Sequence, residues 1–418
     1  MPASHDKACE LLVHNARIHP CVTDGKIASE TNFTVRGGRI AAIGVDDAVP
    51  AHERFDAKGA LLLPGFVDCH THLCYAGNRM DEHAARLEGA SYAGIAKRGG
   101  GIHSTVAAVA AASEDELIAE SLPRLEALVA EGATTVEIKS GYGLTPENEL
   151  KQLRAIRRLG ELSPARIVPT FLALHALPAN ADRKRYVKTV IEETLPAVVE
   201  EKLADCVDVF CEHMAFTVEE MRAVFERARE LGLACRAHSD QLSNLGGTRA
   251  AAGLSARSCD HLEYSQDADV QALADTGAVA VLLPGAFYFL REKQLPPIDA
   301  LRKAGVPIAI ASDLNPGTSP IASPLAVLHL ASTLFRLTPE EALLGLTRHG
   351  AAALALEEKV GGLAVGRRAD FTLWDIPGPE FFCYQLGGIQ PHAVYIEGKA
   401  YVADKFSPRH SRVGGNPV

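Results

Sequence analysis

The residues best suited to chemistry are a histidine pair, His70 and His72, and three polar residues much later in the chain, His238, His261 and Asp313. In an extended segment the two imidazoles of a His-x-His pair lie on one side and can share one cation. Imidazoles together with a carboxylate suit Zn²⁺, Fe²⁺ or another borderline divalent ion. The pattern therefore predicts a metal site, provided that the fold brings these residues together.

Each of these residues alone is explained more simply as an ordinary polar residue of the core or surface, and an isolated His-x-His pair is a weak motif. Their positions argue otherwise when they are taken together. In a closed barrel of parallel strands, the reactive side chains project from the carboxyl ends of the strands. Four separate predicted strand ends each carry a group that can bind metal, which is improbable by chance.

The elements that must position these groups are short apolar runs. Eight such runs precede or reach the polar residues, each long enough for a buried strand and too short for a typical helix. Helical stretches separate most of them, so we predict an α/β fold with a (β/α)8 TIM-like barrel. A doubly wound open sheet is the alternative, but neither a GxGxxG nor a P-loop follows a first strand. The predicted strands are Leu61 to His70, Thr134 to Lys139, Ile167 to Leu174, Val207 to Cys211, Ala234 to His238, Cys259 to Glu263, Val279 to Leu283 and Pro307 to Ser312.

Local signals place several of the helices between these strands. A capping box predicts a helix start, because its first side chain accepts a hydrogen bond from the backbone three residues later. Glycine is common where a helix stops, since it adopts the left-handed conformation freely. The capping boxes are Ser113 with Glu116, Thr217 with Glu220 and Thr338 with Glu341, and the stop signals are Gly132 and Gly232.

Both ends of the chain have short alternating strands with glycine turns. We predict that residues 1–60 and 362–405 form one small composite β-sandwich domain, that residues 61–361 form the barrel, and that residues 406–418 are a flexible tail. The strand signals outside the barrel include Phe33 to Ile43 around Gly37-Gly38, Phe371 to Trp374, and Val394 to Val402 around Gly398.

Composition and charge narrow the choice of partner. The 418 residues carry a net charge of -10, with a pI near 5.9 and no Lys/Arg block. We therefore expect a small-molecule substrate and neither nucleic acid nor a membrane surface. The nine cysteines lack CxxC spacing and no signal peptide is present, so we expect a cytoplasmic protein without disulfides. A homodimer is the default expectation for a soluble oligomer.

Longer motifs resemble a known family. Leu63 to His72 is similar to the strand-one signature of the amidohydrolase superfamily, and the later His, His and Asp follow in that superfamily's order. The resemblance narrows to the imidazolonepropionase family and extends from about residue 10 to residue 405. It implies hydrolysis of the cyclic amide of 4-imidazolone-5-propanoate to N-formimidoyl-L-glutamate in histidine breakdown. The narrower motifs are Val136 to Leu144, Thr170 to Ala176, Ala237 to Leu242, Asp260 to Tyr264 and Ser312 to Ser319.

The resemblance also implies roles for individual residues. It implies one divalent ion per subunit, zinc or iron, with four ligands: His70, His72, His238 and Asp313. Such an ion activates a water molecule to attack the ring carbonyl. His261 is favoured for polarisation and proton relay, with Asp313 as the alternative base. The implied substrate contacts are Arg79, Tyr92, Tyr142, His175, Gln241, Asn315, Gly317 and Thr318.

Several of these roles compete with simpler explanations. Arg79 suits the propanoate carboxylate, because a guanidinium can donate two parallel hydrogen bonds, but it can equally be a surface arginine. Tyr142 can be a turn residue within Gly-Tyr-Gly. Asn315, Gly317 and Thr318 can simply form a tight turn.

Two positions distinguish the reaction that the resemblance implies from the reactions of related enzymes. Cytosine-type deaminases carry a glutamate where this chain has Gln241, and an amide can bind a ring but cannot move a proton. Binuclear relatives place a bridging carboxylate, often a carbamylated lysine, on strand four. Here the tip of that strand has no lysine, so we expect one metal ion, with Glu212 either bridging or orienting a ligand. The alternatives are a cyclic-amide hydrolase of the hydantoinase or dihydroorotase type, a cytosine-type deaminase, and an inactive barrel scaffold.

Overall fold

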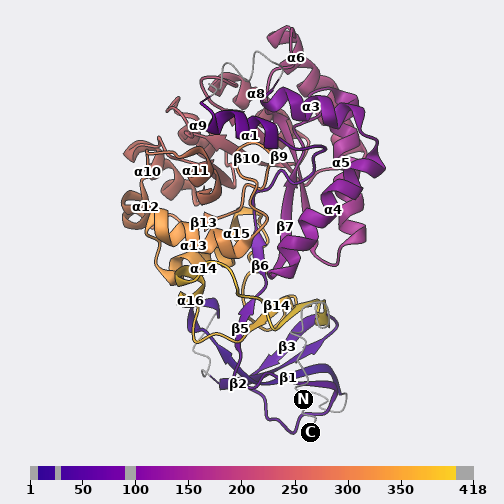
Figure 1. Cartoon of the computed structure of the whole chain (residues 1–418), viewed down its shortest axis with the longest axis vertical. Coiled ribbons are helices and arrows are strands. Elements are labelled where there is room, and N and C mark those ends of the chain that lie inside the picture. Colours follow the sequence, from indigo (N-terminus) through magenta and orange to yellow (C-terminus); the bar gives the residue numbers. More distant parts are fainter. Residues whose placement is uncertain (1–7, 24–29, 90–99, 402–418) are drawn as a thin grey trace, which may run out of the picture.

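The computed structural model describes residues 8–23, 30–89 and 100–401, which form two sheets and the helices around them. Both sheets have eight strands. The parallel sheet, which we call the larger sheet because most helices surround it, lies in the upper part of Figure 1, and the mixed sheet, which we call the smaller sheet, lies below. Within the described ranges, no helix combines the length and apolar character needed to cross a membrane. The predicted tail, residues 406–418, lies outside the described residues.

The larger sheet consists of parallel strands that follow one another in chain order, β6 to β13. The ring is nearly closed by contacts between the segments after its first and last strands: Asp313 N donates to His70 O at 2.9 Å and His72 N to Leu314 O at 3.0 Å. The barrel prediction is confirmed, and the residues that close the barrel include predicted metal ligands. The strands are β6 (Phe66–Asp68), β7 (Ala133–Lys139), β8 (Arg166–Leu174), β9 (Cys206–Cys211), β10 (Ala234–Ser239), β11 (Ser258–His261), β12 (Val279–Leu282) and β13 (Ile308–Ile310).

Helices follow most of these strands and lie around the barrel (Figure 1). All three predicted capping boxes are present at helix starts, and the predicted stop glycines adopt left-handed φ angles of 99° and 82°. The helices are α1 (Met80–Leu87), α3 (Ile102–Ala111), α4 (Glu114–Ala130), α5 (Pro146–Leu162), α6 (Arg183–Thr189), α7 (Leu195–Glu200), α8 (Val218–Glu230), α9 (Gly247–Gly253), α10 (Asp267–Thr276), α11 (Pro284–Leu290), α12 (Ile298–Ala304), α13 (Pro324–Phe335), α14 (Pro339–Gly345), α15 (Arg348–Ala353) and α16 (Glu380–Tyr384).

The smaller sheet combines strands from both ends of the chain, in the order β16-β15-β14-β5-β1-β2-β3, with β4 also paired to β1. The hairpin predicted around Gly37 and Gly38 is confirmed, and both glycines adopt positive φ angles, 60° and 68°, as a tight hairpin turn requires. The division of the chain into two domains stays a prediction. The strands are β1 (Cys9–Ile18), β2 (Glu30–Arg36), β3 (Arg39–Ile43), β4 (Ala51–Asp56), β5 (Leu61–Pro64), β14 (Phe371–Trp374), β15 (Ala393–Ile396) and β16 (Lys399–Ala400).

The first predicted barrel strand, residues 61–70, is in fact two strands that belong to different sheets. β5 pairs with β14 and β1 of the smaller sheet, whereas β6 pairs with β7 of the barrel. Gly65 lies between them and donates its N–H to Asp370 O at 2.9 Å. His70 and His72 follow β6 in an extended segment, so they lie at the mouth of the barrel and not within a strand. The predicted sixth strand also ends early, at His261, where the backbone turns with φ of 86°.

We predict that Gly65→Ala destabilises the protein, because an added methyl group would collide with the side chain of Thr134. Overpacking of this kind costs about 1–3 kcal/mol. Gly253→Ala in α9 is the matched control, since nothing lies within 4 Å of its added methyl group. Urea unfolding should show a lower free energy of unfolding for the first variant only. Equal stabilities of the two variants would contradict the close packing at Gly65.

Candidate metal centre and active site

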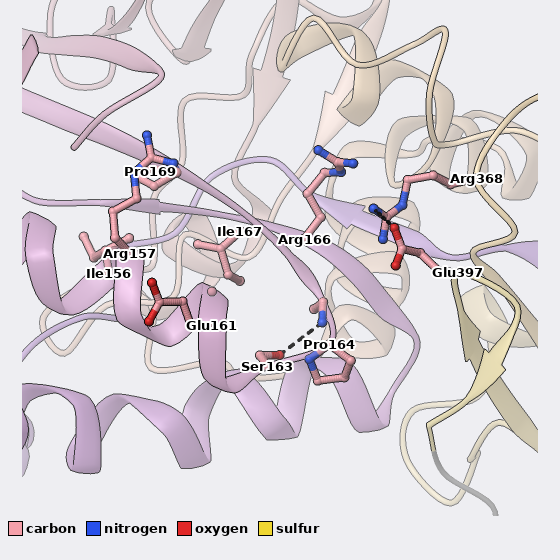
Figure 2. Close-up of a pocket in the computed structure, with 12 residues that line it drawn as sticks. Ile156, Arg157, Glu161, Ser163, Pro164, Arg166, Ile167, Pro169, Arg368 and Glu397 are labelled. Atoms are coloured by element: carbon pink, nitrogen blue, oxygen red, sulfur yellow. Dashed lines mark hydrogen bonds and ion pairs between the residues drawn. The ribbon is translucent and has the colours of Figure 1, made fainter. Parts of the chain in front are cut away.

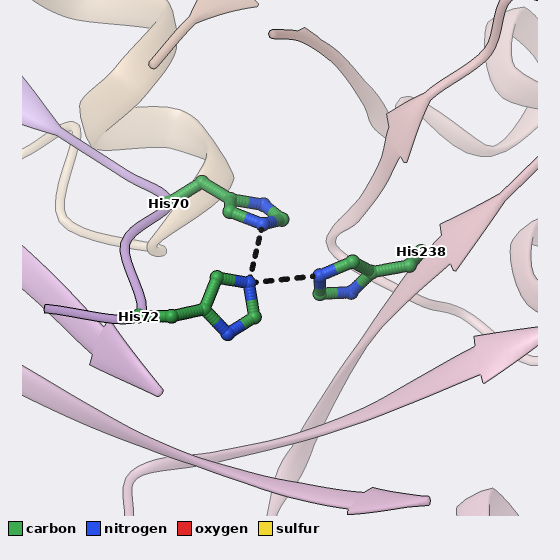
Figure 3. A group of neighbouring side chains, drawn as sticks. All are labelled: His70, His72 and His238. Carbon is green, nitrogen blue, oxygen red and sulfur yellow. Dashed lines mark hydrogen bonds between the residues drawn. The ribbon is translucent and has the colours of Figure 1, made fainter. Parts of the chain in front are cut away.

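Three imidazoles converge at the mouth of the barrel, as Figure 3 shows. Nε2 of His72 lies 3.3 Å from Nε2 of His70 and 3.3 Å from Nε2 of His238. Metal–nitrogen bonds of about 2.0–2.1 Å in a tetrahedral site place neighbouring ligand atoms about 3.3–3.4 Å apart. All three side chains are buried. The spacing of the three nitrogens therefore suits one shared cation.

Asp313 lies beside this group. Its Oδ1 is 3.4 Å from Nε2 of His72 and 3.6 Å from Nε2 of His70. The residue adopts a left-handed φ of 50°, a strained conformation for a residue other than glycine. All four predicted ligands thus lie together, although Asp313's coordinating role stays a prediction.

The outer nitrogens of two imidazoles face carboxylates. His70 Nδ1 lies 2.6 Å from Asp260 Oδ2, and His238 Nδ1 lies 3.0 Å from Asp208 Oδ1. Because a carboxylate accepts hydrogen bonds, each Nδ1 carries the proton and each Nε2 keeps its lone pair toward the centre. Burial lowers the pKa of His70 well below its ordinary value, which favours the neutral imidazole that binds metal. The donor set therefore fits a divalent cation.

Beneath the imidazoles lies a layer of buried charged side chains that span the barrel interior. Lys139 Nζ lies 2.8 Å from both Glu137 Oε1 and Asp208 Oδ2. Arg236 lies 3.0 Å from Asp260 and 3.4 Å from Glu137. Burial alone would lower the pKa of Lys139, but Asp208 and Glu137 raise it above its ordinary value, so the amine stays charged. Each carboxylate that holds an imidazole is therefore held in turn by a buried cation.

The same layer also contacts the backbone next to His72, at Thr71. Glu137 Oε2 accepts the N–H of Thr71 at 3.1 Å, and the hydroxyl of Thr71 donates to Glu137 O at 2.7 Å. Thr71 is the residue between the two histidines of the pair. Its fixed backbone sets the direction of both flanking side chains.

This charged layer was not among the predicted site residues, although the sequence contains a signal for it. Charged residues alternate with apolar ones inside strands that otherwise look buried, as in Glu137-x-Lys139 and Arg236-x-His238. Such residues point to one face, and in a barrel strand that face is the interior. A charge on the inner face of a buried strand indicates a partner across the barrel.

His261 lies on the other side of the imidazole group. Its ring centroid is 5.6 Å from that of His238 and 6.0 Å from that of His70. Its Nδ1 is buried and has no hydrogen-bond partner among the described residues. Burial lowers the pKa of His261 well below its ordinary value, so the ring is neutral. The predicted catalytic role is not tested by this geometry, but the ring lies at the site with an unused nitrogen.

Tyr142 and His175 line the group from β7 and β8. The His175 ring stacks on His72 at 5.4 Å, and Tyr142 lies 5.3 Å from His175. His175 Nδ1 donates to Gly141 O at 2.9 Å, which leaves its Nε2 as an acceptor. Burial lowers the pKa of His175 to about 4. These two rings form one wall of the site, and substrate contact by either stays a prediction.

Arg79 and Gly317 are brought together although they are far apart in the chain. The guanidinium of Arg79 lies where a side chain on Gly317 would be, so a larger residue at that position would require Arg79 to shift. Arg79 Nε donates to Glu82 at 2.9 Å, which fixes the orientation of the guanidinium. The side chain is 11% exposed, so Arg79 is not an ordinary surface arginine.

Asn315 organises the loop that carries Asp313. Its Oδ1 accepts the N–H groups of Gly317 at 2.8 Å and Thr318 at 2.7 Å, and its Nδ2 donates to Asp313 O at 2.7 Å. These contacts form the tight turn that was the simpler explanation for the segment. They also fix Asp313, while contact of Asn315, Gly317 or Thr318 with substrate stays a prediction.

The sequence left two roles open for Glu212, bridging two metal ions or orienting a ligand, and the hydrogen bonds of its side chain match neither. Its Oε2 accepts the N–H groups of Leu242 at 2.9 Å and Ser243 at 3.1 Å, so it holds the loop after β10. It is not part of the imidazole group found among the described residues. Gln241, on the same loop, is half-buried. Tyr92 lies outside the described residues.

Comparisons with known proteins agree with this geometry. The amidohydrolase family model matches residues 61–407. Imidazolonepropionase from Xanthomonas campestris pv. campestris is 47% identical over 416 residues, covering 97% of this chain and 98% of the relative. Imidazolonepropionase from Bradyrhizobium diazoefficiens is 50% identical over 383 residues, covering 90% of this chain and 95% of the relative.

Solved structures share the fold at low sequence identity. A zinc-bound adenosine deaminase from Xanthomonas campestris has a TM-score of 0.68 at 17% identity, covering 94% of this chain and 93% of its own. A zinc complex of atrazine chlorohydrolase from Arthrobacter aurescens has a TM-score of 0.70 at 17% identity, covering 93% and 94%. The barrel and its imidazole group thus define a metal-dependent hydrolase of the amidohydrolase class. Within that class the chain belongs to the imidazolonepropionase family, and the family predicted from the motifs is confirmed.

We predict that His238→Ala removes one of the three converging nitrogens and with it most of the bound metal. Metal content per chain, measured after purification and dialysis, should fall well below that of the wild type. His329→Ala, at a histidine on α13 outside the imidazole group, should keep the wild-type content. Full metal retention in His238→Ala would contradict the assigned site.

We predict that Asp208→Asn weakens metal binding about 10- to 100-fold, because the carboxylate that orients His238 is lost. A competition titration with a chelator would measure the change. Asp370→Asn is the matched control: Asp208 is a buried carboxylate paired with Lys139, and Asp370 is a buried carboxylate paired with Arg368, next to the smaller sheet. Both variants should lose stability, and only the first should lose metal affinity. Equal affinities would show that Asp208 does not act on the metal site.

Proposed function

We propose that this protein hydrolyses the cyclic amide of 4-imidazolone-5-propanoate to N-formimidoyl-L-glutamate, a step of histidine breakdown. The supporting observation is the near full-length similarity to imidazolonepropionases, 47% identity over 97% of the chain. The site geometry is consistent with that reaction, because a triad of imidazoles and a fixed, mostly buried guanidinium are present. A cyclic amide with a carboxylate tail needs both groups.

We further propose one divalent ion, zinc or iron, per subunit, held by His70, His72, His238 and Asp313. Imidazole nitrogens with one carboxylate suit either metal. When bound, such an ion supplies Lewis-acid chemistry and lowers the pKa of water, so that a nucleophile exists at neutral pH. A single ion is favoured because Glu212, the carboxylate nearest the tip of β9, is hydrogen-bonded to the loop after β10.

His261 is proposed as the residue that moves the proton. It enters the reaction neutral, so it can accept a proton from the attacking water and return it to the departing ring nitrogen. Its nitrogen without a partner is available for this exchange. Asp313 is the alternative base, because it is also next to the proposed metal position.

Substrate binding is proposed to begin with Arg79, which would donate two parallel hydrogen bonds to the propanoate carboxylate. Gly317 makes room for that guanidinium. Gln241 would bind the ring without moving a proton, which favours ring opening over deamination. The further proposed contacts are Tyr92, Tyr142, His175, Asn315 and Thr318.

The cellular setting is proposed from general expectations. A small polar substrate and an acidic chain favour the cytoplasm. A homodimer is the default assembly for a barrel enzyme of this kind. Neither proposal affects the chemistry of a single subunit.

The test of the reaction is a comparison of substrates with the purified, metal-loaded protein. Loss of imidazolone absorbance should be rapid, and hydantoin, dihydroorotate and cytosine should be inert. Turnover of one of the other three in preference to the imidazolone would replace the proposed substrate. Inactivity toward all four in a protein that carries its metal would favour the inactive scaffold.

We predict that Arg79→Ala raises KM about 10- to 100-fold with little change in kcat, because a charged hydrogen bond worth about 1.5–3 kcal/mol is lost from both the bound substrate and the transition state. Arg79→Lys should recover part of the loss, since it keeps the charge without the two-pronged geometry. Arg302→Ala, at a surface arginine paired with Glu341, should leave both constants unchanged. An effect of Arg79→Ala on kcat alone would place Arg79 outside substrate binding.

A further inference from the structure

A second polar cavity lies at the end of the barrel opposite the metal centre. Its volume is about 430 Å³, and its walls come from α5, the first residues of β8, and the smaller sheet (Figure 2). Arg166 is the first residue of β8, whereas the imidazoles lie at or just after the carboxyl ends of the barrel strands. The cavity is therefore separate from the active site described above.

Three arginines line this cavity, and two of them already have carboxylate partners. Arg157 lies 2.7 Å from Asp205. Arg368 lies 2.9 Å from Asp370 and 2.6 Å from Glu397. Arg368 thus lies between two carboxylates, and the third arginine is the one without a close carboxylate partner among the described residues.

The third arginine, Arg166, has no such partner within the part of the chain that the structure describes. Its Nε is buried and makes no hydrogen bond. Figure 2 shows its guanidinium next to Arg368; Asp370, Glu397 and Asp205 act on it only from beyond hydrogen-bond distance. Burial, and then the neighbouring charge of Arg368, lower the pKa of Arg166, although an arginine stays protonated.

A partly buried guanidinium whose Nε–H makes no hydrogen bond is unfavourable, and carboxylates beyond contact distance do not satisfy that donor. An anion in the cavity would accept hydrogen bonds from Arg166. Ser163 also lines the cavity, away from that guanidinium, and its hydroxyl oxygen accepts the N–H of Ala165 at 3.2 Å (Figure 2). Glu161 also lines the cavity and is exposed, so an anion would sit on the arginine side.

We propose that this cavity is a second ligand site, which binds a small oxyanion, a carboxylate or a phosphate, through Arg166. Arg166 belongs to the barrel, and its neighbour Arg368 is fixed to the smaller sheet by Asp370 and Glu397. A bound oxyanion links these two parts and stabilises the folded protein. The site is independent of the proposed reaction, since no residue of the metal centre lines it.

The test is thermal unfolding of the metal-loaded protein in sodium phosphate, sodium succinate or sodium chloride at equal ionic strength. At saturating oxyanion, Tm should rise by about 2–5 °C over chloride. A rise in phosphate alone identifies a phosphate ligand, and a rise in succinate alone identifies a carboxylate. Equal Tm values in all three salts would overturn the proposal.

Variants test whether the rise in Tm comes from an anion bound in this cavity. Arg166→Met should lose the rise, and Arg154→Met, on the same helix-strand unit but paired with exposed Glu201, should keep it. Arg166→Lys should weaken oxyanion binding about threefold or more, because it keeps the charge without the two-pronged geometry, and it provides a second measure should Arg166→Met fail to fold. His238→Ala should keep the rise. A rise that survives Arg166→Met, or that disappears in His238→Ala, would place the anion elsewhere and overturn the proposal.

Discussion

The site depends on one buried set of ion pairs. Asp208 and Asp260 hold the outer nitrogens of two imidazoles, and Lys139 and Arg236 hold those carboxylates. Removing charges from water costs several kcal/mol per ion, and only close pairing offsets it. An apolar barrel interior would have been easier to stabilise. What the charges provide is direction: His70 and His238 each have one tautomer and one orientation before any cation arrives.

The backbone at the mouth of the barrel is strained for the same purpose. His261 and Leu262 have φ angles of 86° and 74°, and Asp313 has 50°. Strained residues of this kind cost on the order of 1–3 kcal/mol each, so the surrounding structure must hold them. Leu262 N donates to Ser239 O, and Asn315 fixes Asp313. The strained positions coincide with the polar groups that must face the site, which is where strain serves a function.

Much of this could be predicted from the sequence, because the signals are local. Buried strands leave apolar runs, capping boxes mark helix starts, and a polar residue at a strand end indicates the open face of a barrel. The pairing of His70 with Asp260 has no such signal, since 190 residues separate them. The same holds for Leu61 to Pro64: its apolar residues suit either sheet, and only packing around Gly65 decides between them. Glu212 was ambiguous because a carboxylate near a ligand can hold either the ligand or a loop.

The two ends of the barrel are connected by its strands, and β8 shows how. It begins at Arg166, next to the polar cavity, and His175 follows its last residue, stacked on His72. Between them the strand pairs with β7 and β9, which carry Lys139 and Asp208. A change at the base of β8 must move these paired strands to reach the metal centre. The buried ion pairs resist that movement, because shifting one partner leaves a charge unpaired. Surface charges at the base can therefore vary while the geometry of the three imidazoles stays fixed.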